Sequence, residues 1–175
     1  IHASAYACNQ IGIENTTFLN CKIFNFSSSI YDSTLISFWN DVDLGFAFDD
    51  YVGFDSTSRM GIVYNGDSID ETTQGYGTNL TQRGVVIIKQ PGDQPNYRSP
   101  VGSFVFHNNA LAGLGDPDST HQFYNYMTGS TKNGLPFRSG CDPTDTTYPT
   151  TSYVYPDDPS ILGGNSEFQC NNIPN

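Results

Sequence analysis

Trp-Asn-Asp-Val-Asp-Leu-Gly-Phe-Ala-Phe-Asp-Asp-Tyr-Val-Gly-Phe-Asp, residues 39–55, is a stretch with five aspartates and no basic residue. Carboxylates at this density repel one another unless open water or a bound cation screens their charge. Aspartates that alternate along a loop, with Gly45 permitting a sharp bend, are typical of an oxygen site for a hard cation. We therefore predict a Ca2+-binding loop, and the alternative is a solvated acidic turn. The predicted ligands are Asp41, Asp43, Asp49, Asp50 and Asp55.

The residues on either side of this loop predict β-strands. Tyr51–Asp55 and Met60–Tyr64 flank a short polar turn, which favours a β-hairpin. Upstream, residues that alternate between two faces from Thr16 to Phe26 predict one long strand. Thr34–Trp39 predicts a second strand, antiparallel to the first if the Ser-rich connection between them is a hairpin turn.

Further along the chain the strand signals are shorter and one helix is predicted. Val85–Ile88 is an apolar run that predicts a buried strand, and residues 101–107 and 152–155 favour two more strands. Asp116–Gly129 has a capping residue, apolar side chains three or four apart and a terminal glycine, which predict a helix. The pattern predicts one all-β domain over residues 1–175, an antiparallel, jelly-roll-like β-sandwich with long loop insertions and one short helix.

The charge balance limits the partners that the chain can have. Aspartate and glutamate outnumber lysine and arginine by 18 to 7, which gives a formal net charge of -11. Such a field repels nucleic acid and anionic membranes, and no apolar run is long enough for membrane insertion. The chain has few lysines and glutamates and many uncharged polar residues, a composition typical of extracellular proteins. We therefore expect the chain to be part of a larger secreted or surface protein.

Four cysteines, Cys8, Cys21, Cys141 and Cys170, lie far apart in the sequence and form no Cys-x-x-Cys pair. This spacing argues against a zinc ribbon or a redox motif and favours two disulfides. Three connectivities exist, and the local one joins Cys8 to Cys21 and Cys141 to Cys170. The alternative is four free thiols in a reducing compartment.

Residues 16–90 resemble a domain of large secreted and cell-surface proteins of Bacteroidota that are exported by the type IX secretion system. The motifs that carry the resemblance are Trp39-x-Asp41-x-Asp43-Leu44-Gly45, Asp49-Asp50-Tyr51-Val52-Gly53-x-Asp55, Gly61-Ile62-Val63-Tyr64-Asn65-Gly66-Asp67 and Gly75-Tyr76-Gly77. Tyr124-Asn125-Tyr126-Met127 and the segment 132–137 are similar to the helix of that family and its exit. The segment after Gly77 departs from the pattern, and the chain carries no sorting domain.

The resemblance implies location and architecture more than activity. It implies a secreted or surface-exposed module whose partners are other domains or proteins of the cell surface or of the export machinery. It also implies O-glycosylation where Asp precedes Ser or Thr and an apolar residue or Thr follows. That tripeptide marks Ser33, Ser56, Ser68, Ser119 and Thr146.

Three functions are compatible with these patterns. The first is a non-catalytic, calcium-stabilised module for adhesion, display or extracellular assembly. The second is a carbohydrate-binding module of a polysaccharide-degrading enzyme, with loop tyrosines that stack on glycans. The third is a glycoside hydrolase that uses two of the clustered aspartates, but so many neighbouring acids are better neutralised by a cation than by proton sharing.

Overall fold

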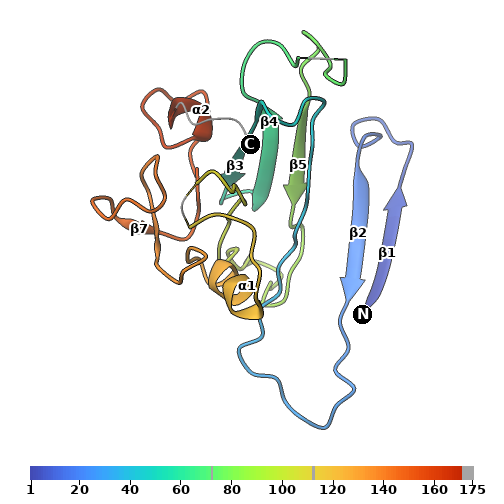
Figure 1. Cartoon of the computed structure of the whole chain (residues 1–175). Helices are drawn as coiled ribbons and strands as arrows, with labels where there is room; N and C mark the ends of the chain where they lie inside the picture. Colours follow the sequence, from blue (N-terminus) through green and yellow to red (C-terminus); the bar gives the residue numbers. More distant parts are fainter. Residues whose placement is uncertain (72, 112, 171–175) are drawn as a thin grey trace. The chain divides into compact units, whose positions relative to one another are not determined.

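The computed structural model describes residues 1–71, 73–111 and 113–170, and the chain divides into two compact units. Unit 1 comprises residues 1–35 and unit 2 comprises residues 36–175. Within the described residues the strands form three sheets, all antiparallel (Figure 1). The regular secondary structure of the described residues is therefore mostly strand with little helix, as predicted for an all-β protein, while a sandwich or jelly-roll arrangement stays a prediction.

Unit 1 is a β-hairpin of β1 (His2–Ala7) and β2 (Thr17–Lys22), with His2 opposite Lys22 and Ala7 opposite Thr17. The strand is thus shorter than the predicted range 16–26. Its partner strand begins at His2, opposite Lys22, so residues 23–26 have no partner strand to pair with. The predicted partner strand at 34–39 is wrong. Those residues form no strand, and β1 takes the place beside β2.

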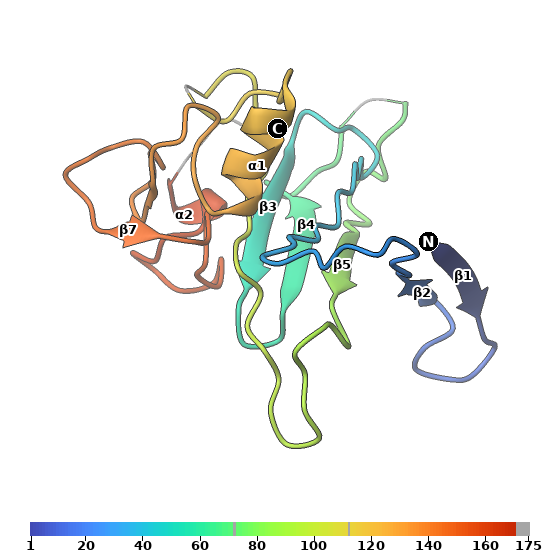
Figure 2. The ribbon, with the colours of Figure 1, turned by 90° about the horizontal axis from the view of Figure 1, so that it is seen from below.

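Unit 2 is organised on a sheet of β3 (Asp50–Asp55), β4 (Met60–Asn65) and β5 (Gln82–Val86), in that order (Figure 2). The predicted hairpin between β3 and β4 is confirmed, with Asp50 opposite Asn65 and Asp55 opposite Met60. The predicted buried strand at 85–88 is corrected. β5 begins three residues earlier and is mostly exposed, because it is an edge strand that pairs with β4 alone.

The helix predicted at 116–129 is confirmed as α1 (Thr120–Met127), whose N-cap Ser119 accepts a hydrogen bond from the Gln122 backbone N–H. A second helix, α2 (Glu167–Cys170), contacts β3 (Figure 1). A small sheet of β6 (Phe137–Arg138) and β7 (Thr150–Thr151) completes the elements. The predicted strands at 101–107 and 152–155 reduce to one bridge, between Phe104 and Tyr153. No helix of the described residues is both long and apolar enough to cross a membrane.

The core of unit 2 is aromatic. Its buried members come from the loop before α1, from α1, from β6 and from the segment after β7: Phe106, Leu114, Tyr126, Phe137, Val154 and Tyr155. Beside this cluster the ring of Phe54 on β3 stacks on those of Phe104 and Tyr153, with centroids 4.9 and 5.0 Å away. The sheet is thereby attached to the loops that follow it, which fixes the position of the strand ends.

One of the two predicted disulfides is present. Cys141 and Cys170 are joined, with Cα atoms 5.3 Å apart and a sequence separation of 29, so α2 is covalently held to the loop after β6. The predicted bond between Cys8 and Cys21 is wrong, because both are free and exposed. The hairpin register places Cys21 opposite Ala3, five residues from Cys8, a separation of about 17 Å along the strand. Disulfides need Cα atoms within roughly 7 Å.

Candidate metal centre

An acidic cluster lies at the end of the sheet where β3 begins and β4 ends. The pairing of Asp50 with Asn65 brings the residue before β3, Asp49, beside the loop that leaves β4. The backbone N–H of Gly66 donates to the Asp49 carbonyl at 2.7 Å, and a Cβ on Gly66 would lie 2.8 Å from that same oxygen. Glycine at this position therefore permits the close approach of the two segments.

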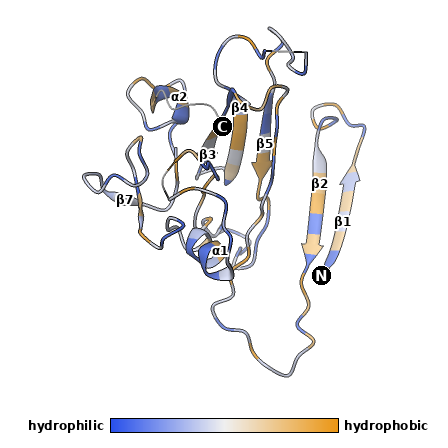
Figure 3. Cartoon of the chain, in the orientation of Figure 1, coloured by the Kyte–Doolittle hydropathy of each residue, from blue (hydrophilic) through white to orange (hydrophobic). Residues whose placement is uncertain are grey.

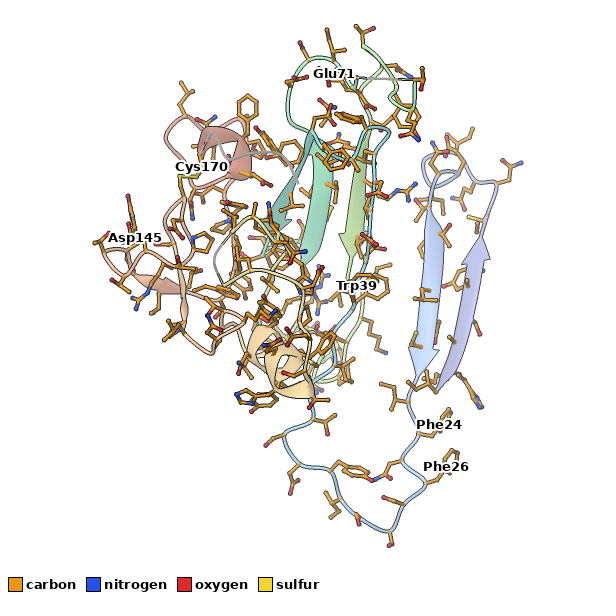
Figure 4. All side chains as sticks on the ribbon, viewed as in Figure 1. Phe24, Phe26, Trp39, Glu71, Asp145 and Cys170 are labelled. Carbon is orange, nitrogen blue, oxygen red and sulfur yellow. A yellow bond between two sulfur atoms is a disulfide. The ribbon has the colours of Figure 1, made fainter. Side chains whose placement is uncertain are left out.

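Three carboxylates meet at this end of the sheet. Asp49, Asp67 and Glu71 each offer one carboxylate oxygen, and these oxygens all lie within 4.8 Å of one another. Glu71 projects from the loop beyond the strands (Figure 4). Such a cluster could hold a metal ion, because three carboxylates provide negative charge and oxygen ligands of the kind that hard divalent cations prefer.

Asp49 is the buried member of the cluster, with a relative exposure of 7%. Its Oδ2 accepts a hydrogen bond from Asn65 Nδ2 at 3.0 Å, but its Oδ1 is buried without any hydrogen-bond partner. Buried polar atoms are nearly always paired in folded proteins, and an orphaned charged acceptor is costly. This oxygen therefore requires a ligand, such as a cation or a proton shared with a neighbour.

Glu71 and Asp67 complete the cluster from the exposed side. The contact of the Glu71 carboxyl with that of Asp49 raises the pKa of Glu71, because it favours a proton between the two groups. Asp67 is held in position by its own loop, since its Oδ1 accepts the backbone N–H of Ile69 at 2.8 Å. Two carboxylates in contact need either a proton or a cation, and a divalent cation would satisfy all three groups together.

Asp50, the residue after Asp49, interacts with a second set of carboxylates. Asp50 is 3% exposed, its Oδ2 accepts the Leu44 backbone N–H at 2.8 Å, and its Oδ1 has no partner. Burial raises the pKa of Asp50 to about 6, and the charges of Asp49, Asp70 and Asp43 add to that effect. Negative charge is thus concentrated around a carboxyl group that has little contact with solvent.

Asp70 joins the acidic loop to the loop after β4. Its Oδ1 accepts the backbone N–H of Phe46 and its Oδ2 accepts that of Tyr76, each at 2.8 Å. Gly45, with φ of 66°, allows the turn, and any side chain at this position would collide with the Asp70 carboxylate. Asp70 is therefore a structural acceptor that holds the two acidic loops together.

The structure separates the five predicted ligands. Asp49 belongs to the cluster, whereas Asp50 is buried next to it in the chain and Asp43 is exposed but close enough to Asp50 to raise its pKa. Asp41 is exposed. Asp55 lies at the opposite end of β3, about 17 Å along the strand from Asp50, where it accepts the backbone N–H groups of the following turn.

The sequence prediction missed Asp67 and Glu71, although a usable signal was present. The predicted hairpin pairs the start of the strand at 51–55 with the end of the strand at 60–64. Acidic residues just after the second strand must then lie beside those just before the first. A ligand set taken from one continuous loop does not include these neighbours across the hairpin.

All five predicted O-glycosylation residues are exposed: Ser33, Ser56, Ser68, Ser119 and Thr146. Ser119 is also the N-cap of α1, where its hydroxyl oxygen accepts a backbone N–H. A glycan at that position would compete with the cap. Exposure is compatible with modification at each of the five residues, and their occupancy stays a prediction.

Comparison with known proteins returned no relative. No protein-family model, no curated protein and no solved structure matches this chain.

Proposed function

We propose that the protein is a non-catalytic, calcium-stabilised module of a secreted or surface-exposed protein. The observation that carries the proposal is the Asp49 carboxylate, which is buried, has one unpartnered oxygen, and offers an oxygen within 4.8 Å of carboxylate oxygens of Asp67 and Glu71. A cation at this point would compensate the buried charge and join the end of β4 to the start of β3. Its role would therefore be to stabilise the fold.

Calcium is the cation that fits these residues best. The ligands are all oxygens, which argues against zinc and other metals that prefer nitrogen or sulfur. Two of the three carboxylates are exposed, so water molecules can complete a flexible shell of six to eight ligands. Magnesium demands stricter octahedral geometry and retains its water more strongly.

A catalytic use of the same acids has less support. The pKa of Asp50, raised to about 6, is in the range that a general acid needs. However, its carboxyl is almost fully buried and its Oδ2 is bonded to the Leu44 backbone, so a substrate has little access to it. We therefore propose a structural role for these carboxylates.

The proposed location rests on the disulfide between Cys141 and Cys170, which hints at an oxidising compartment. We place the module at the cell surface or outside the cell, as the resemblance to type IX-exported proteins of Bacteroidota implies. Adhesion, display and extracellular assembly are the proposed activities. Partners would be other surface or export proteins, with glycans as an alternative.

Thermal unfolding with and without calcium tests the proposal. The protein, freed of metal with EGTA, is expected to melt at a higher temperature once excess CaCl2 is added, because the ion binds the folded state alone. The same concentration of MgCl2 should give a smaller shift. Equal melting curves in EGTA and in millimolar calcium would refute the calcium proposal.

A further inference from the structure

Unit 1 is a hairpin that nothing in its own unit covers. Among its described residues only Ile13 and Phe18 are partly buried, and hydrophobic residues are distributed along both strands (Figure 3). A two-stranded hairpin alone is marginally stable in water. The sheet has just two strands, so the outer edge of β2 presents free backbone donors and acceptors. This edge is able to accept another strand.

Two thiols on this hairpin have no partner in the chain. Cys8 and Cys21 are free and exposed, whereas Cys141 and Cys170 form a disulfide with each other. The register keeps Cys8 about 17 Å from Cys21. In a compartment where Cys141 and Cys170 are oxidised to a disulfide, an unpaired exposed cysteine points to a bond with another chain.

The sequence around Cys21 is complementary to itself when β2 meets a second β2 in antiparallel orientation. Centred on Cys21, such a register places Leu19 opposite Ile23 of the second copy and Phe18 opposite its Phe24. Lys22 would face Asn20, so no like charges meet. Cys21 would face Cys21 of the second copy, at the 4.5–5.5 Å Cα separation typical of opposite antiparallel residues, which suits a disulfide.

The alternation that continues past Lys22 fits this arrangement. Ile23 and Phe24 have no intrachain partner strand, and both are exposed, at 56% and 45%. Phe24 projects from the segment that leaves β2 (Figure 4). On its face of the hairpin Tyr6 already stacks on Phe18, with centroids 5.2 Å apart, so a second copy would extend an existing aromatic row.

The distribution of charge also favours contact through unit 1. Unit 1 has one lysine against Glu14 and Asp32, a net charge of -1, so unit 2 carries the remaining -10 of the total -11. Contact between two copies of unit 2 would bring like charges together, whereas two hairpins meet almost without repulsion.

We propose that two copies of this chain associate along β2, in antiparallel register centred on Cys21, and that a disulfide between the two Cys21 residues locks the dimer. The bond forms by thiol–disulfide exchange with a small disulfide such as oxidised glutathione. Two protein thiols lose their protons and two electrons, one S–S bond forms between the chains, and the oxidant is reduced to two thiols. The resulting sheet has four strands and does not involve the acidic cluster.

Non-reducing electrophoresis and peptide mapping in a glutathione redox buffer test this proposal. We expect a species of twice the 19.2 kDa chain mass that contains a peptide joining Cys21 to Cys21. Cys21→Ser should abolish the covalent dimer, and Cys8→Ser should preserve it. A chain that stays monomeric with glutathione on Cys21, a dimer joined through Cys8, or an intrachain bond between the two would overturn it.

A second set of variants tests the register while Cys21 is kept. Phe24→Asp, which introduces a charge beside Phe18 of the second copy, should slow dimer formation at least several-fold. Ile11→Asp is the control, because Ile11 is 95% exposed and lies in the hairpin loop. Equal rates for the two variants would overturn the register. The dimer should form equally in EGTA and in calcium. A failure of the dimer proposal can therefore be distinguished from a failure of the calcium proposal.

Discussion

The effect of Asp49→Asn on the stability of the protein should change sign when calcium is added. Without calcium the wild-type protein buries a carboxylate with one unpartnered oxygen beside two other carboxylates. An amide at this position removes the charge, can still accept from Asn65 and can donate to Glu71. We therefore expect the variant to be more stable than the wild type in EGTA and to have lost the stabilisation by calcium.

The magnitude follows from the burial of Asp49. An unsatisfied buried polar atom costs about 1–3 kcal/mol. In a domain of this size that corresponds to a rise of roughly 2–10 °C in the melting temperature of the variant in EGTA. At calcium about a hundredfold above its dissociation constant, the wild type should gain about 2.7 kcal/mol, whereas the variant should gain little.

The assay is differential scanning calorimetry of both proteins in EGTA and in CaCl2. Asp32→Asn is a matched control, because it removes one exposed aspartate charge from unit 1 and should leave the response to calcium unchanged. If Asp49→Asn lowers the melting temperature equally in both buffers, Asp49 is only an acceptor for Asn65. That result would refute a cation at this point.

Three further predictions concern unit 2. Burial raises the pKa of Glu167 from 4.5 to about 8. The unfolded chain therefore loses this proton at lower pH than the folded protein, so the stability should fall as pH rises from about 4.5 to about 8. Glu167→Gln should flatten a plot of melting temperature against pH over that range, and an unchanged slope would contradict this. Phe137→Ala, at a fully buried core position, should cost about 3–5 kcal/mol in urea unfolding, and a loss below about 1 kcal/mol would contradict its placement. Cys141→Ser should lower the free energy of unfolding by about 3.5 kcal/mol, because it opens a 29-residue loop. Adding reductant should destabilise the wild type by the same amount and should leave the variant unchanged.

Local patterns predicted the parts of the fold that depend on neighbouring residues. The hairpin of β3 and β4 is closed by a four-residue turn, and α1 is delimited by its own cap and terminal glycine. Both signals lie within the element itself. The Cys141–Cys170 bond was also predicted, since it is the local pairing at that end of the chain.

The errors concern contacts that sequence patterns do not specify. Alternation continues to Phe26, but a strand extends only as far as its partner, and β1 provides none beyond His2. Residues 34–39 have strand composition without a strand to pair with. The apolar run at 85–88 was assigned to the interior, whereas β5 is an edge strand whose position follows from its register with β4.

Of the three carboxylates in the candidate site, the sequence predicted one, Asp49, for the same reason. Density of aspartates identified the loop that contains Asp49 and Asp50. The other members, Asp67 and Glu71, come from across the hairpin, and Asp55 is separated from them by the full length of β3. Acidic residues that are close in sequence can be far apart in space when they lie along a strand, because an extended chain advances about 3.3 Å per residue.

The calcium site is tested most directly by a crystal structure of the protein grown with calcium, with anomalous data collected at long wavelength. We predict an anomalous peak between Asp49, Asp67 and Glu71, with carboxylate oxygens from all three at roughly 2.3–2.6 Å and six to eight oxygen ligands in total. Ordered density at these carboxylates without an anomalous peak, in crystals containing calcium well above millimolar concentration, would contradict the account.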